Sequence, residues 1–176
     1  MPRAPRAAQS TDGLQSDVFR ALSRRLKSRS GPLFPLHVGD TWREPLAGAR
    51  AEAQATKDHP GLHRYAPPLG EPALLEAIDE HLQRAGGHVE RDRLQVVSGA
   101  TVGLSLAAQT VLDPGDEVLL PSPFWPLIRG ILVARGAVPV QLPIFTRLTD
   151  DGFDLEATLE AAVTDRTAAI YLNTPH

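Results

Sequence analysis

The sequence contains no cysteine, no strong excess of charge of either sign and no long apolar run. Without cysteine, the chain can form no disulfide, no thiolate zinc site and no thiol nucleophile. Its formal net charge of -3 provides no strong field that would attract nucleic acid or an anionic membrane, so we expect neither partner. Because no stretch could span a bilayer or form the apolar core of a signal peptide, we expect a cytoplasmic protein.

Several well-known site motifs are also missing. The sequence has neither the Gly-x-Gly-x-x-Gly fingerprint of dinucleotide-binding domains nor a Gly-x-x-x-x-Gly-Lys-Ser/Thr phosphate loop. Their absence argues against a generic α/β nucleotide-binding protein. The sequence has no Gly-x-Ser-x-Gly elbow either. His59 and His63 have the spacing of metal ligands on a helix, but Pro60 and Gly61 between them would break that helix. We therefore expect no metal site.

The composition, 42% hydrophobic and 22% charged, is that of an ordinary globular protein with one sizeable core. Residues 1–45 are predicted to form an N-terminal arm, a helix and an extended segment, ahead of a domain over residues 46–176. Gly31 and Pro32 indicate where the helix has ended. Its predicted apolar face consists of Leu14, Val18, Phe19, Leu22 and Leu26.

The second region alternates between helical and strand-like patterns. This alternation predicts an α/β fold with three α/β/α layers and a mostly parallel sheet. Asp154 is the expected cap of the last helix, whose inner face would be Leu155, Leu159 and Val163. The expected helices cover 49–58, 72–85, 102–112, 126–135 and the residues after 154, and the expected strands cover 94–97, 117–120, 138–142 and 168–172.

The best local signal for a binding site is Ser98-Gly99-Ala100-Thr101, between a predicted strand and a predicted helix. The first amides of a helix lack intrahelical partners, and the helix dipole makes that end positive. Gly99 and Ala100 leave room for an anion, and the two hydroxyls could donate to it. The segment is therefore either a phosphate site or a tight turn with a capping Ser or Thr.

A second signal is the segment Pro121–Pro126, which directly follows a predicted strand. Ligands of parallel α/β sheets bind beyond the carboxyl ends of the strands, so this loop and the Ser98–Thr101 loop should share one edge. An aromatic ring held there could stack on a flat cofactor. Alternatively, Phe124 and Trp125 simply fill the core beneath the loop.

Taken together, these segments resemble the class I/II aminotransferases, which are fold-type-I enzymes dependent on pyridoxal 5'-phosphate (PLP). The resemblance extends from about Leu36 to His176. The order and spacing of the motifs carry it more than any single motif does. The matching segments are Leu36–Asp40, Tyr65–Gly70, Ser98–Thr101, Pro114–Val118, Ser122–Pro126 and Leu172–His176.

The resemblance implies how this chain would hold the cofactor. Ser98, Gly99, Ala100 and Thr101 match the family's phosphate loop, in which the amides of Ala100 and Thr101 would bind the PLP phosphate. Trp125 matches the aromatic residue that stacks on the pyridine ring, and Phe124 would replace it if the loop were offset by one residue.

Three further positions follow from the same resemblance. Tyr65 matches the tyrosine that reaches the phosphate of the neighbouring subunit's cofactor, which implies a homodimer. Gly39 matches a glycine near the substrate carboxylate. Asn173 precedes the family's Asn-Pro-Thr-Gly motif, so the asparagine that bonds the cofactor's phenolic oxygen would come after this chain. Asn173 is therefore not expected to have that role.

The resemblance implies an aminotransferase that moves an amino group between an amino acid and a 2-keto acid. The family's Schiff-base lysine would lie downstream, and Lys57 stands before the phosphate loop, in the wrong place. The chain also ends directly after a strand-like run, which favours a truncated, inactive N-terminal portion with no catalytic residue of its own. Decarboxylases, lyases and synthases share these motifs, and a non-catalytic PLP-binding domain is a further alternative.

Overall fold

The computed structural model describes residues 6–9, 18–32, 43–50, 52 and 55–174. Its contacts divide the chain into two compact units. One unit is Leu26–Val96, and the other is Val97–His176 together with Met1–Arg25. The sequence analysis predicted a domain boundary between residues 45 and 46, where segments of different composition meet. This domain boundary stays a prediction. In the described part of the chain, no helix is both long and apolar enough to cross a membrane.

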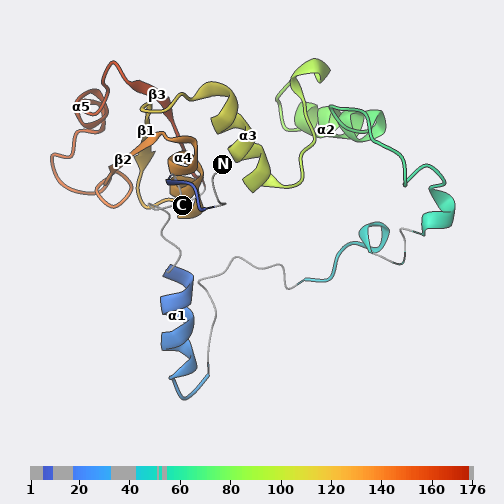
Figure 1. Cartoon of the computed structure of the whole chain (residues 1–176), viewed down its shortest axis with the longest axis horizontal. Coiled ribbons are helices and arrows are strands. Elements are labelled where there is room, and N and C mark those ends of the chain that lie inside the picture. Colours follow the sequence, from blue (N-terminus) through green and yellow to red (C-terminus); the bar gives the residue numbers. More distant parts are fainter. Residues whose placement is uncertain (1–5, 10–17, 33–42, 51, 53–54, 175–176) are drawn as a thin grey trace, which may run out of the picture. The chain divides into compact units, whose positions relative to one another are not determined.

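The unit that includes Val97–His176 is built on a parallel sheet of three strands in the order β2-β1-β3 (Figure 1). All five residues of the central strand β1 are buried, and β1 has a neighbouring strand on each side. A helix connects each strand to the next, as parallel pairing requires. The elements are α3 (Ala100–Val111), β1 (Glu117–Pro121), α4 (Leu127–Arg135), β2 (Val138–Leu142), α5 (Leu155–Glu160) and β3 (Thr167–Ile170).

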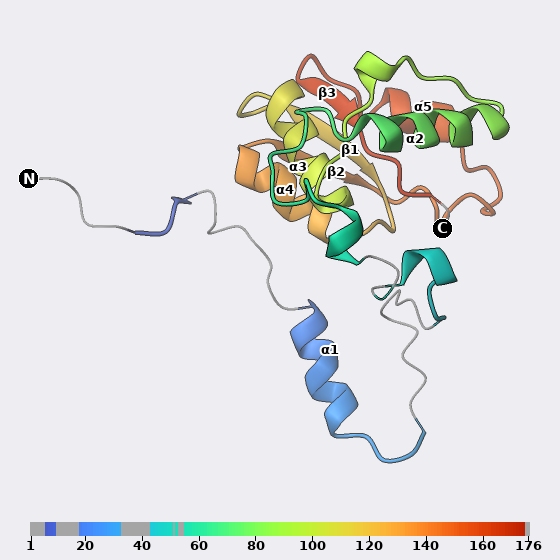
Figure 2. The same cartoon turned by 90° about the vertical axis from the view of Figure 1, so that its right-hand side faces the viewer.

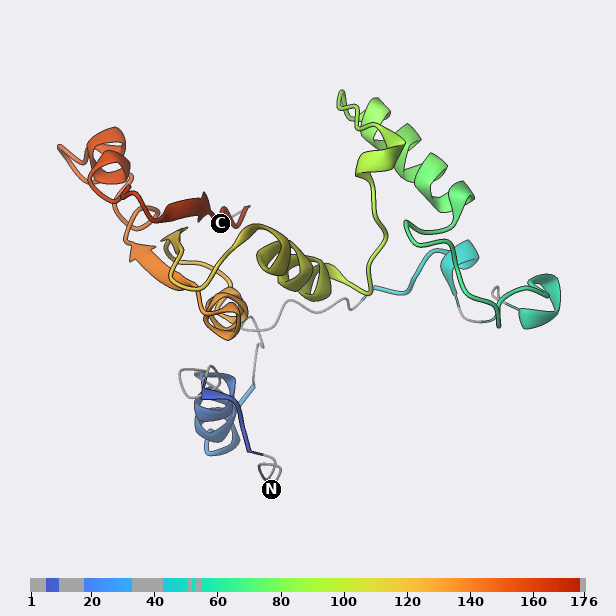
Figure 3. The ribbon, with the colours of Figure 1, turned by 45° about the horizontal axis from the view of Figure 1, so that its top comes forward.

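Helices cover the sheet from both sides. Ala108 of α3 and Ile128 and Leu132 of α4 pack with Val118 and Leu120 of β1 in one buried cluster. Figure 3 shows the strands between these two helices and α5, which lies on the other side. The predicted α/β fold with a parallel sheet is therefore confirmed.

One predicted strand, residues 94–97, is not part of the sheet. Leu94 has extended backbone angles, but the next hydrogen bond of this segment goes from the Val96 amide to the Leu69 carbonyl at 2.8 Å. A β-prone run therefore forms no strand here. The prediction of a strand was wrong because a strand forms only where neighbouring segments pack and pair with it. Local composition does not specify those neighbours.

Two predicted helices also differ in detail. Among the described residues, the segment expected as a helix over 49–58 contains no α-helix: the 3₁₀ turns Ala47–Ala49 and Thr56–Asp58 lie there, and Glu52 is also in 3₁₀ conformation. Asp154 caps α5 as predicted, because its side chain accepts a hydrogen bond from the Ala157 amide at 2.9 Å. The predicted inner face of α5 was wrong for two residues: Leu155 is 41% exposed and Val163 57% exposed. Since α5 ends at Glu160, its periodicity does not extend to Val163.

The unit Leu26–Val96 contains α2 (Pro72–Arg84), which Figure 2 shows from the side. Its first residue is Pro72, as predicted, since a helix needs no amide donor there. Gly70, ahead of it, has a φ of +120°, and a Cβ at this position would lie 2.6 Å from Cγ2 of Val96. Only glycine fits this turn without displacing Val96. The helix predicted within residues 1–45 is present as α1 (Val18–Lys27). Its predicted apolar face stays a prediction, because Leu14 and the side chains of Val18 and Phe19 lie outside what the structure describes.

A buried carboxylate fixes the start of β1. The side chain of Glu117 accepts hydrogen bonds from the Thr164 hydroxyl at 2.7 Å and from the Arg166 guanidinium. The hydrogen bond from Thr164, followed by those from Arg166, lowers the pKa of Glu117 below its usual value. This carboxylate thus joins β1 to the turn ahead of β3, and its role is structural.

Candidate functional site

Helix α3 begins with amides that have no acceptor among the described residues. Gly99 is its N-cap, with a φ of +97° that suits only glycine, and open space surrounds the position of a Cβ there. The first helical hydrogen bond runs from the Gly103 amide to the Gly99 carbonyl at 3.1 Å. For the described part of the chain, the amides of Ala100, Thr101 and Val102 therefore remain available to a ligand.

The side chains around this helix start favour an anion. No side chain caps α3, so the alternative of a capping Ser or Thr is not what the structure contains. Ser98 and Thr101 are exposed, and no described residue accepts from their hydroxyls. The first turn of α3 has no acidic residue that would oppose an anion. Three amides, two hydroxyls and the positive end of a helix dipole form a donor set that fits a phosphate group.

The loop after β1 is held at both ends. At its beginning, the backbone amide and the hydroxyl of the buried Ser122 both donate to the Leu142 carbonyl, at 2.7 and 3.0 Å. At its end, the Trp125 amide donates to Oδ1 of Asn173 at 2.9 Å. Phe124 and Trp125 are half-buried and pack against the core cluster. Core packing thus holds both residues without burying them completely.

The start of α3 and the loop after β1 belong to the same edge of this unit. Helix α3 is followed by the short connection over residues 112–116, and α3 and β1 pack together in one core cluster. A connection this short allows that packing only if the chain reverses its direction. With 12 and 5 residues, the two elements have similar lengths of about 17 Å. The beginning of α3 therefore lies near the end of β1, where β2 and β3 also end because they are parallel to β1. This is the edge at which α/β sheets bind ligands.

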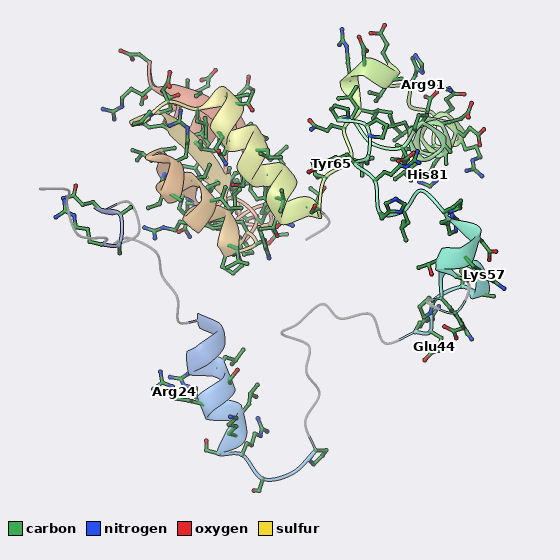
Figure 4. The ribbon with its side chains drawn as sticks, turned by 45° about the vertical axis from the view of Figure 1, so that its right-hand side comes forward. Arg24, Glu44, Lys57, Tyr65, His81 and Arg91 are labelled. Atoms are coloured by element: carbon green, nitrogen blue, oxygen red, sulfur yellow. The ribbon has the colours of Figure 1, made fainter. Side chains whose placement is uncertain are left out.

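Other candidate residues lie elsewhere or outside the described part. Tyr65 is fully exposed in the unit Leu26–Val96 (Figure 4). Lys57 lies in the exposed 3₁₀ turn Thr56–Asp58 (Figure 4). Gly39 falls outside the described residues. No group of three or more metal-ligating side chains occurs among the residues that the structure describes, where His59 and His63 are both exposed.

The contact between Asn173 and Trp125 was not predicted from the sequence. A signal for it was present, because both residues follow the carboxyl ends of neighbouring parallel strands. Residues at these positions meet at one edge of a sheet. The sequence alone does not show that the Asn173 side chain turns toward the Trp125 amide.

An α/β unit that combines a helix start fit for a phosphate with a half-buried aromatic loop after a strand could hold a phosphorylated cofactor. The model of the family "Aminotransferase class I and II" matches residues 33–176. The chain belongs to this family, whose members depend on pyridoxal 5'-phosphate.

Individual relatives agree with this assignment. The chain is 36% identical over 145 residues to the aspartate/prephenate aminotransferase of Thermus thermophilus, covering 81% of this chain and 34% of that protein. It is 36% identical over 163 residues to the arginine–pyruvate transaminase of Pseudomonas aeruginosa, covering 90% of this chain and 39% of that protein. The crystal structure of the aspartate aminotransferase of Rhizobium meliloti superposes with a TM-score of 0.81 at 30% identity, covering 98% of this chain and 43% of that one. The chain spans about a third of the length of the curated relatives it matches.

Proposed function

We propose that this chain binds PLP as part of an aminotransferase that moves an amino group between an amino acid and a 2-keto acid. The observation that carries the proposal is the shared sheet edge at which the free amides of α3 and the loop of Trp125 lie, in a chain of the aminotransferase family. Bound PLP would supply an electron sink for negative charge at the substrate Cα.

The residues of this chain would bind and orient the cofactor. The amides of Ala100 and Thr101 would donate to the phosphate, with the hydroxyls of Ser98 and Thr101 as further donors. The ring of Trp125, supported by the core behind it, would cover one face of the pyridine ring and exclude water from it. Anchoring and shielding are the contributions of the described residues, whereas proton transfer needs groups that they do not provide.

Further parts of the proposal concern the whole protein. We expect a homodimer in which Tyr65 serves the neighbouring subunit's cofactor, and its full exposure is compatible with such a contact. We expect cytoplasmic residence, a role in amino acid metabolism and a substrate carboxylate near Gly39. The relatives named for aspartate, prephenate, arginine and pyruvate support testing amino acids and keto acids as substrates.

The test is a PLP-binding and activity measurement on the protein expressed from its whole gene. We expect saturable PLP binding and transfer of the amino group from an amino acid to a 2-keto acid, followed by chromatography of both products. Release of carbon dioxide or cleavage of the substrate side chain instead would identify a decarboxylase or lyase, and condensation with a second substrate a synthase. PLP binding with no turnover would indicate a non-catalytic domain. Absence of PLP binding would contradict the proposal entirely.

A further inference from the structure

The chain beyond β3 continues beside β1 and reaches the aromatic loop. The Tyr171 amide donates to the Leu119 carbonyl at 2.9 Å, so the pairing with β1 extends past the end of β3. Two residues later, the half-buried Asn173 accepts the hydrogen bond of the Trp125 amide through Oδ1. This bond joins segments that are 48 residues apart in the sequence.

The backbone of Trp125 is held on both sides. Its amide donates to Asn173 at 2.9 Å, and its carbonyl accepts from the Ile128 amide at 3.3 Å, at the start of α4. The Tyr171 hydroxyl lies 3.5 Å from the same Oδ1 of Asn173, which adds a long second contact to this oxygen. The rotamers that a side chain can adopt depend on its backbone angles, so fixing the peptide ahead of Trp125 restricts where its ring can point.

We infer that Asn173 is a positioning residue for Trp125 that holds the ring ready for the cofactor. The inference rests on the proposed function, in which Trp125 covers the pyridine ring of PLP. Asn173 itself needs no contact with the cofactor. Its side chain replaces water as the acceptor of the Trp125 amide. The loop therefore loses less conformational entropy when PLP binds.

The first experiment follows Trp125 in the cofactor-free protein. The protein expressed from its whole gene is labelled with 5-fluorotryptophan, and the ¹⁹F resonance of residue 125 is identified by its loss in Trp125→Phe. Asn173→Leu, which has a similar shape but no acceptor, should shift and broaden this resonance. Asn173→Asp, which keeps the acceptor oxygen, should restore the wild-type signal. Gln109→Leu also replaces an amide side chain by leucine, but on the exposed surface of α3, and should leave the signal unchanged.

The second experiment compares the affinity for PLP with that for inorganic phosphate. Asn173→Leu should weaken PLP binding about five- to tenfold, the effect of one hydrogen bond, and change phosphate binding less than twofold. The negative charge of Asn173→Asp should weaken both ligands alike, so the ratio of the two affinities should return to the wild-type value. General destabilisation of the site would instead weaken both ligands in Asn173→Leu.

An unchanged ¹⁹F resonance or an unchanged affinity ratio in Asn173→Leu would overturn the inference. So would a failure of Asn173→Asp to restore the resonance. If the wild-type protein does not bind PLP, the proposed function fails, whereas the ¹⁹F comparison in the cofactor-free protein still decides whether Asn173 positions Trp125.

Discussion

Replacing Ala100 by Asp should abolish most of the PLP affinity while making α3 more stable. A side chain in the first turn of a helix tilts toward the N-terminus, where the phosphate would lie, and the Ala100 side chain is exposed. A carboxylate about 5 Å from the phosphate should cost about 2–3 kcal/mol of binding free energy, or about 50-fold in affinity. The same carboxylate interacts favourably with the helix dipole and should stabilise α3 by about 0.5 kcal/mol. Fluorescence titration with PLP and thermal unfolding measure the two effects.

The matched control for this substitution is Ala100→Asn. It has nearly the same shape as Asp without the charge, so it should weaken PLP binding by much less. Raising the ionic strength should recover part of the affinity lost in Ala100→Asp, because salt screens exposed charges. Equal losses for Asn and Asp would mean that shape, rather than charge, governs this position and would argue against a phosphate at the start of α3.

Replacing Leu120 by Ala should give the largest loss of stability in the sheet. Leu120 is fully buried (0% exposed) in the central strand and belongs to the cluster that joins β1 to α3 and α4. Truncating a fully buried leucine removes buried apolar area and leaves a cavity, for an expected loss of about 3 kcal/mol. Hydrogen exchange of the β1 amides, followed in the protein from the whole gene, should show this loss as faster exchange.

Ile170→Ala is the control for Leu120→Ala. Ile170 is an aliphatic residue of similar size in the neighbouring strand β3, but it is 46% exposed. Its truncation should cost about 1 kcal/mol because less apolar surface is lost and no closed cavity forms. If both variants lost the same protection in β1, the cluster around Leu120 would not be the main source of stability in this unit.

The features that were predicted correctly depend on local chemistry. Asp154 as a helix cap and Pro72 at the first position of α2 each follow from the backbone requirement of one position. The parallel strands β1, β2 and β3 follow from the alternation of apolar segments with helices. The same topology leads to the expectation that Ser98–Thr101 and the loop after β1 share one edge. The cofactor-binding roles of these residues stay predictions.

The features that the sequence did not reveal depend on contacts between distant segments. Residues 94–97 have a strand-like composition, but they form no strand, and the Val96 amide bonds to the Leu69 carbonyl instead. The partners of Glu117 are 47 and 49 residues away, and Asn173 meets Trp125 across 48 residues. Side-chain hydrogen bonds of this kind leave no periodic pattern in a sequence. They become visible only when the fold has brought the segments together.

The most direct test of the account is a crystal structure of the protein from the whole gene, grown with PLP. We expect the phosphate oxygens at about 2.7–3.2 Å from the amide nitrogens of Ala100 and Thr101, the range of ordinary hydrogen bonds. The ring of Trp125 should lie against the pyridine ring, with its amide still bonded to Asn173. A cofactor phosphate bound away from the start of α3, or a pyridine ring without contact to Trp125, would contradict the central claim.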